Sequence, residues 1–237
     1  KSGYAVLNWD NEITRNMAKD SDAKVFYYGS SREDCHLWYD QVDLSIKHTK
    51  LCLHYKQESV EVKYPLLGRH QLTSALAAAS VGILNGLNLL TIRRGLMEMV
   101  PSPHRFSVVE GPNGSTIIDD TYNASPVAVK AALQTVSELP AKRRIAILGE
   151  MKELGDYNEE GHRLIGNEVA KLNFDILITY GGNAQLIGKE VSKHLDGRGK
   201  GTEVIPMNDI RTILDWITNN AKDKDLILIK GSRHHIH

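Results

Sequence analysis

Short apolar runs separated by turns dominate the first part of the chain, and several of them alternate apolar and polar residues. A period of two places every second side chain on one face, which predicts half-buried β-strands. We expect these strands over Tyr4–Trp9, Lys24–Tyr28, Val42–Lys47, Leu51–Tyr55 and Val60–Tyr64. Apolar residues then recur at three- to four-residue steps, which predicts amphipathic helices over Gln71–Leu87 and Leu90–Met99.

Beyond Pro101 and Pro103 the pattern changes to apolar runs that alternate with helical stretches. The apolar runs predict strands over Thr116–Asp119, Arg144–Leu148, Ile176–Tyr180, Glu203–Ile205 and Leu226–Ile229. The stretches between them predict helices over Pro126–Glu138, Asn158–Leu172, Asn183–His194 and Asn208–Asn220. Alternating strands and helices imply parallel βαβ units, so we expect an α/β fold with a doubly wound sheet. The two prolines place the expected domain boundary at Val100–His104, between residues 1–100 and residues 101–237.

The composition is that of an ordinary globular protein, since 41% of the 237 residues are hydrophobic and 24% are charged. The 29 basic and 29 acidic residues balance, so we expect neither nucleic acid nor a membrane as a partner. Cys35 and Cys52 lie in segments without metal-ligand spacing and are expected to be free thiols. No apolar run approaches the roughly 18 residues that span a bilayer, and no signal-like amino terminus is seen, so we expect a cytoplasmic protein.

The run Ile117–Pro126 is the most informative segment, because an apolar strand ends there in two acids, an amide and a helix-opening proline. In open α/β sheets, ligands bind outside the carboxyl ends of the strands. A single acid could serve only to cap the following helix, but a cap needs one oxygen, and Asp119 and Asp120 supply two carboxylates. Tyr122 and Asn123 follow them. The loop therefore predicts a site for a polar ligand.

Three further segments accompany this loop: Gly68–Ala78 precedes it, Leu148–Gly155 follows it, and Lys230–Arg233 lies near the end of the chain. In this order, the four segments resemble the Mur ligase family. They are most similar to the members that join D-alanyl-D-alanine to UDP-N-acetylmuramoyl-tripeptide in peptidoglycan synthesis. The resemblance covers nearly all of the chain, yet only about the second half of such an enzyme.

The resemblance implies an ATP-dependent amide ligase that works through an acyl phosphate. Residues 1–100 would be the later part of a central ATPase domain, with mixed strands and helices. Residues 101–237 would be a C-terminal Rossmann-like domain.

The resemblance also implies roles for residues near the nucleotide. Arg105 corresponds to an arginine that contacts the transferring phosphate, and it is the candidate catalytic residue. Either Asp119 or Asp120 would accept hydrogen bonds from the ribose hydroxyls, and the choice between them stays open. The other candidate ATP-binding residues are His70, Gln71, Ser74, Tyr122 and Asn123. Gln71 and Ser74 stand where the family has asparagines.

For the second substrate, D-alanyl-D-alanine, the resemblance points to the strand ends. Glu150 is a candidate for steering the ammonium group, and His162 is a weaker one. Lys230, Ser232 and Arg233 would donate to a carboxylate, and Asn123 is also a candidate for contact with this substrate. From the residue types alone, a strand-to-helix loop with tight turns explains Leu148–Gly155 better than a substrate site does, and a solvated basic terminus explains Lys230–Arg233 as well as one.

A ligase of this family needs a Gly-rich phosphate-cradling loop ending in Gly-Lys-Thr or Gly-Lys-Ser, and the chain has no such segment. Also missing are the family's UDP-sugar domain, its carbamoylated lysine and its magnesium-binding acid and histidine, so the Mg²⁺ ligands are expected upstream. We expect this chain by itself to hydrolyse no ATP and to form no amide bond. His234, His235 and His237 have no partner acid at ligand spacing, so we predict no metal site.

Two alternatives stay open. Another ligase of the family, with a different acid and amine, would share the fold and the ATP-binding half. A non-catalytic binding or scaffold protein would have kept the Rossmann-like half after losing the phosphate loop. We expect a monomer, and the sequence does not indicate the third residue of the peptide substrate.

Overall fold

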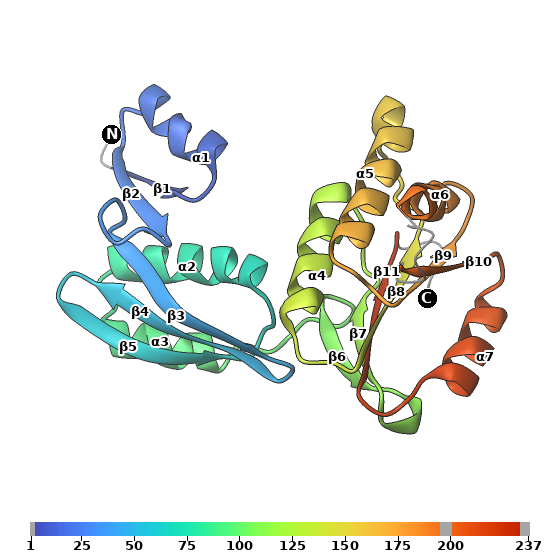
Figure 1. The fold of residues 1–237 in the computed structure, drawn as a ribbon. Coiled ribbons are helices and arrows are strands. Elements are labelled where there is room, and N and C mark those ends of the chain that lie inside the picture. Colours follow the sequence, from blue (N-terminus) through green and yellow to red (C-terminus); the bar gives the residue numbers. More distant parts are fainter. Residues whose placement is uncertain (1–2, 195–200, 233–237) are drawn as a thin grey trace. The chain divides into compact units, whose positions relative to one another are not determined.

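The computed structural model describes residues 3–194 and 201–232 of the chain. It divides into two compact units, Lys1–Val100 and Pro101–His237. Each unit contains one β-sheet with helices packed against it (Figure 1). Each unit has its own cluster of buried apolar side chains.

The first unit is a five-stranded sheet in the order β1-β2-β3-β4-β5. The strands are β1 (Tyr4–Asn8), β2 (Lys24–Gly29), β3 (Leu37–Ser45), β4 (His48–Tyr55) and β5 (Glu58–Tyr64). The helices are α1 (Glu12–Asn16), the 3-10 turn η1 (Met17–Asp20), α2 (Arg69–Leu84) and α3 (Leu89–Met97). Strands β1 to β3 are parallel, whereas β3, β4 and β5 are antiparallel.

The core of this unit forms on one face of the sheet. In β4, Leu51 and Leu53 are buried and belong to the same cluster as Leu72 and Leu76 of α2. Because successive side chains of a strand point to opposite faces, Cys52 lies on the face away from this core. One face of the β3–β4–β5 region is therefore packed against helices, and the other carries polar side chains.

Strand β3 begins at Leu37, well before the predicted start at Val42. The register between β3 and β4 shifts between Asp40 and Asp43, and Gln41 has a positive φ of 52°. Such a β-bulge inserts an extra residue and interrupts the alternation of faces. The sequence period therefore predicted only the part of the strand that follows the bulge.

The second unit is a six-stranded sheet in the order β10-β9-β8-β11-β7-β6. The strands are β6 (Ser107–Glu110), β7 (Thr116–Asp120), β8 (Arg143–Gly149), β9 (Ile176–Tyr180), β10 (Glu203–Met207) and β11 (Asp225–Lys230). All pairs are parallel except β6 with β7. The edge strand β6 was not predicted, because three of its four residues are exposed and no buried alternation marks it.

The helices cover both faces of this sheet. They are α4 (Pro126–Glu138), α5 (Asn158–Lys171), α6 (Gln185–Lys193) and α7 (Ile210–Asn220), with short turns η2 (Pro112–Gly114) and η3 (Gly155–Tyr157). From β7 through β8 and β9 to β10, each successive strand lies farther toward the β10 edge of the sheet. Right-handed crossovers in one direction place their helices α4, α5 and α6 on the same face. The step from β10 back to β11 places α7 on the other face (Figure 1). This is the predicted doubly wound, Rossmann-like arrangement.

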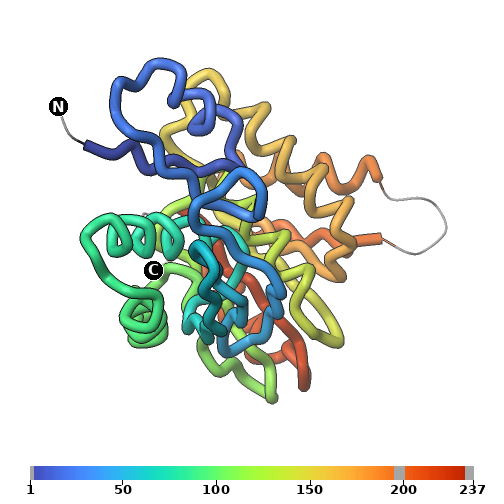
Figure 2. Tube along the Cα trace, turned by 90° about the vertical axis from the view of Figure 1, so that its left-hand side faces the viewer, coloured from blue at the N-terminus to red at the C-terminus, as the bar shows by residue number. Residues whose placement is uncertain are grey.

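Helices α5 and α6 are packed against each other and lie next to one another in both views of the molecule (Figures 1 and 2). Their close approach requires Gly166, because a Cβ there would lie 2.5 Å from the Glu190 Cβ and 2.6 Å from the Ile187 carbonyl oxygen. Helix α4 begins as its sequence predicts, with Pro126 in the first turn after the cap Ser125. All the predicted strands and helices are present.

Candidate functional site

Polar side chains gather at the carboxyl edge of the second sheet. Strands β7, β8, β9 and β11 are parallel, so their carboxyl ends meet at one edge. Asp120 at the end of β7 lies directly across from Lys230 at the end of β11. Glu150 follows β8, and Asn183 follows β9. We call Asp119, Asp120, Glu150, Asn183, Lys230 and Ser232 the strand-end cluster.

Lys230 connects β11 to the loop after β7. Its Nζ lies 2.6 Å from Asp120 Oδ2 and donates to the backbone carbonyl of Asn123 at 2.8 Å. The Lys230 side chain is 3% exposed and that of Asp120 is 17% exposed. Burial raises the pKa of Asp120, and the neighbouring ammonium of Lys230 opposes this shift. The pair therefore holds the loop after β7 in place. Asn123, on this loop, is exposed.

Asp119 is held by a different set of partners. Its Oδ2 lies 2.8 Å from His104 Nδ1, and its Oδ1 accepts from the backbone N–H and the hydroxyl of Thr121 at 3.1 and 2.7 Å. His104 has a positive φ of 59°, and its carbonyl accepts from the Tyr122 N–H at 3.0 Å. The carboxylate thus ties the segment before β6 to the loop after β7.

Arg105 lies beside this loop with its guanidinium over the Tyr122 ring, 3.8 Å from the centroid. A planar cation over an aromatic face is held by the ring's quadrupole while its edge N–H groups stay available. Arg105 is exposed, and Tyr122 is half-buried. The stacking presents a guanidinium that can still donate to an anion.

Glu150 and Ser232 form the other side of the cluster. Asn183 donates to Glu150 Oε1 at 2.6 Å, and the Ser232 N–H donates to the Glu150 carbonyl at 3.2 Å. The Ser232 hydroxyl accepts from the Lys152 N–H at 3.0 Å, and Ser232 is 4% exposed. Asn183 was missed in the sequence, although the Gly181-Gly182-Asn183 run after β9 is another polar strand end.

His162 does not reach this edge as a substrate contact. It is fully buried, its Nε2 accepts from the Met151 N–H at 3.0 Å, and its Nδ1 lies 2.7 Å from the Asn158 carbonyl. One ring nitrogen accepts and the other donates, which fixes a neutral tautomer. His162 supports the backbone that follows Glu150, so the prediction that it steers an ammonium group is wrong.

The remaining nucleotide candidates lie in the first unit, at the start of α2. His70 and Gln71 are half-buried, with their Nε2 atoms 3.3 Å apart, and Ser74 is exposed. The Thr49 hydroxyl accepts from the Gly68 N–H at 3.3 Å and donates to the Leu66 carbonyl at 2.9 Å. These bonds fix the entry into the helix. These residues belong to the first unit, whereas Arg105 belongs to the second.

Arg233, His234, His235 and His237 lie outside the described residues. Within residues 3–194 and 201–232, no helix is long and apolar enough to cross a membrane. Cys35 and Cys52 form no disulfide with each other, as predicted.

Comparison with known families gives two matches. Residues 104–233 match the family described as Mur ligase, glutamate ligase domain, and residues 1–82 match the Mur ligase middle domain.

Relatives with the name UDP-N-acetylmuramoyl-tripeptide--D-alanyl-D-alanine ligase include one from Bacillus subtilis, 31% identical over 76% of this chain and 39% of its own length. One from Escherichia coli is 28% identical over 98% of this chain and 50% of its own. The chain spans about half the length of the relatives it matches.

Two solved structures share the fold. MurF from Acinetobacter baumannii has a TM-score of 0.82 at 23% identity, over 98% of this chain and 49% of its own. MurF ligase from Thermotoga maritima, in complex with ADP, has a TM-score of 0.80 at 23% identity, over 98% of this chain and 50% of its own.

Proposed function

This chain belongs to the Mur ligase family, and we propose that it forms the later half of an ATP-dependent ligase that joins D-alanyl-D-alanine to UDP-N-acetylmuramoyl-tripeptide. The names of its relatives support this choice within the family. Residues 1–100 would be the later part of the central ATP-binding domain. Residues 101–237 would be the C-terminal domain. The enzyme would act in the cytoplasm as a monomer.

The observation that carries the proposal is the strand-end cluster with its stacked Arg105. Internal partners hold Asp119, Asp120 and Glu150 in fixed positions, so the edge is organised before any ligand arrives. Preorganised groups avoid the free-energy cost of ordering them at the moment of reaction. An edge of this kind suits a reaction that depends on positioning two substrates.

In the proposed reaction, the terminal carboxylate of the tripeptide attacks the γ-phosphorus of ATP, and ADP leaves. The amine of D-alanyl-D-alanine then attacks the acyl carbon, and phosphate leaves as the amide bond forms. Arg105 would neutralise charge on the transferring phosphoryl group, since its guanidinium edge is exposed. Asp119 or Asp120 would accept from the ribose, with Tyr122 and Asn123 shaping the site. His70, Gln71 and Ser74 would contribute from α2.

The incoming dipeptide would meet the other side of the cluster. Glu150 would orient its ammonium group, since the carboxylate is half-buried and already aligned by Asn183. The carboxylate of the dipeptide would be stabilised by Lys230, Ser232 and Arg233. Because Lys230 is buried, its main contribution would be to hold the loop that carries Asn123. The ammonium end of the dipeptide would therefore lie at the end of β8, and its carboxylate end at the end of β11.

Magnesium would neutralise phosphate charge in such a reaction. In the described ranges, one group of three side chains lies close enough together to hold a metal ion, and it contains a thiol. Mg²⁺ prefers oxygen ligands, so that group does not fit this ion.

Titration calorimetry with D-alanyl-D-alanine tests the proposed dipeptide site. We expect saturable binding to the 237-residue chain and none of the L,L-dipeptide. Glu150→Gln replaces a charge-assisted contact by a neutral one, so affinity should fall about tenfold. Glu160→Gln, an exposed glutamate of α5, is the matched control and should bind like the parent. Equal affinity of the two variants for D-alanyl-D-alanine would mean that Glu150 does not contact the dipeptide.

A second measurement concerns the nucleotide. Because the phosphate-cradling loop is absent from this sequence, the 237-residue chain alone should release no ADP from ATP. The control is the Arg105→Ala variant, whose ADP release gives the background. Release by the parent above that variant would mean that the chain contains its own phosphate site. A scaffold protein would bind neither ATP nor the dipeptide, and a ligase with another amine would bind a different amine substrate.

A further inference from the structure

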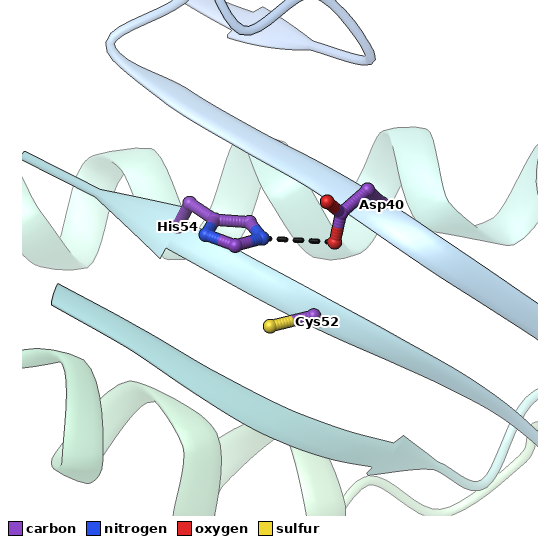
Figure 3. Close-up of side chains that lie close together, drawn as sticks. All are labelled: Asp40, Cys52 and His54. Atoms are coloured by element: carbon purple, nitrogen blue, oxygen red, sulfur yellow. Dashed lines mark hydrogen bonds and ion pairs between the residues drawn. The ribbon is translucent and has the colours of Figure 1, made fainter.

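A group of three different ligand types lies in the first unit, away from the strand-end cluster. Cys52 and His54 are two residues apart on β4, so both point to the same face of the sheet. Asp40 lies on the neighbouring strand β3, directly across from Cys52. Leu51 and Leu53, which alternate with Cys52 and His54 along β4, are buried, so the three side chains lie on the face opposite the core (Figure 3).

The donor atoms of these side chains converge. The His54 Nε2 lies 2.9 Å from Asp40 Oδ1, and the Cys52 Sγ, the imidazole and the carboxylate each have an atom within 4.8 Å of the other two. In a tetrahedral zinc site, metal–ligand bonds of about 2.0 to 2.3 Å put ligand atoms roughly 3.3 to 3.7 Å apart. A side-chain adjustment of about 1 Å would close the cluster around a metal ion.

The His54 ring is oriented by its surroundings. It stacks on the Trp38 ring with centroids 3.7 Å apart and an angle of 3° between the planes. Stacking fixes the plane of the imidazole, so its nitrogen edge stays directed toward Asp40, as the dashed line in Figure 3 shows. A ligand whose ring plane is fixed loses less freedom when a metal binds.

Asp40 and His54 are accessible from solvent, and Cys52 is half-buried beside them. A hollow of about 670 Å³ opens over this face, and Trp38, Asp40, His54 and Ser59 contribute to its lining. The Asp40 side chain is 43% exposed and that of His54 is 17% exposed. The nearby cation Arg32 lies over the Trp38 ring, 5.7 Å from its centroid. A metal ion could therefore enter without rearrangement of the sheet.

We propose that Asp40, Cys52 and His54 form a zinc-binding site with one coordination position left for water. A thiolate, an imidazole and a carboxylate together favour Zn²⁺ over Mg²⁺ or Ca²⁺, which prefer oxygen ligands. On binding, Cys52 releases its proton, and His54 binds through Nε2 with its proton on Nδ1. This site is independent of the proposed ligase reaction, and it departs from the sequence prediction of no metal site.

The proposed site would link β3 to β4 beside the β-bulge. Asp40 is the last residue before the register shift, so a metal bridge there holds the irregular part of β3 against β4. A cation that binds only the folded state stabilises it by mass action. We therefore expect the ion to stabilise the first unit rather than to take part in chemistry.

Cobalt substitution tests the site, because a Co²⁺–thiolate bond gives a charge-transfer band in the near ultraviolet. The parent is the 237-residue chain with His234, His235 and His237 changed to alanine, so that these histidines cannot compete for metal. We expect one equivalent of Co²⁺ to give the band and Zn²⁺ to displace it. Zn²⁺ should also raise the midpoint of thermal unfolding of this parent.

Four variants locate the ligands. Cys52→Ser should abolish the band and the thermal shift, and Asp40→Asn and His54→Gln should each weaken cobalt binding at least about tenfold. Cys35→Ser removes the other thiol, which lines the hollow together with Asp40 and His54, and should change neither readout. The proposal is overturned if the parent gives no band, if Cys35→Ser abolishes it, or if Asp40→Asn and His54→Gln both bind like the parent.

Discussion

At the scale of single residues, Lys230 determines how the loop after β7 is held. Its ammonium is almost fully buried and pairs with Asp120. Removing one partner of a buried pair leaves an uncompensated charge, so we expect Asp120→Asn to lower the free energy of unfolding by about 3 to 5 kcal/mol. The matched control is Asp223→Asn, because the Lys142–Asp223 pair is 62% and 63% exposed and should contribute about 0 to 1 kcal/mol.

Unfolding of both variants in guanidinium chloride measures the two losses in the free energy of unfolding. Similar losses for Asp120→Asn and Asp223→Asn would mean that burial adds nothing to the Lys230 pair.

Residue types alone did not separate structural from functional roles at this edge. The sequence drew attention to His162 and overlooked Asn183, yet His162 is buried with both nitrogens engaged and Asn183 contacts Glu150. Similarly, Cys52 and His54 are only two residues apart in the sequence, but the third member of their group, Asp40, lies on another strand and is not visible from that spacing. A side chain's role depends on its exposure and on its partners, and neither is visible in a local pattern.

At the scale of elements, two glycines in helices should respond oppositely to the same change. Alanine at Gly166 of α5 would place a Cβ against the α6 backbone, so we expect Gly166→Ala to destabilise the protein by about 1 to 3 kcal/mol. Gly95 of α3 has no atom within 4 Å of its virtual Cβ, so Gly95→Ala should stabilise by about 0.5 to 1 kcal/mol through helix propensity.

The two substitutions are chemically identical, so each is the other's control in denaturant titrations. Stabilisation by Gly166→Ala would show that α5 and α6 can separate at little cost. The same contrast shows why sequence reading predicts helices better than their packing, because both glycines interrupt a helical pattern in the same way.

At the scale of the whole molecule, each unit has a buried core of its own, and we expect two separable unfolding transitions. Ile147→Ala in β8 creates a cavity in the second unit and should cost about 2 to 5 kcal/mol there. Leu53→Ala in β4 is the matched change in the first unit. Trp216 lies in the second unit, so in a Trp9→Phe, Trp38→Phe background its fluorescence reports that unit alone.

Ile147→Ala should shift the unfolding transition seen by Trp216 fluorescence to a lower denaturant concentration, whereas Leu53→Ala should leave its midpoint unchanged. A Trp216 transition that shifts equally in both variants would mean that the chain unfolds as one cooperative body.

Apart from β6, the order of strands and helices, the doubly wound sheet and the polar strand ends were determined by the sequence alone. Burial on one face imposes a period of two or of 3.6 on neighbouring residues, and burial on both faces gives the continuous apolar runs of the central strands. Tertiary structure decided which distant residues meet. Lys230 and Asp120 are 110 positions apart, and Asp40 and His54 are 14 apart on different strands. Strand order and register bring such pairs together, and these depend on the packing of the whole sheet rather than on any local period.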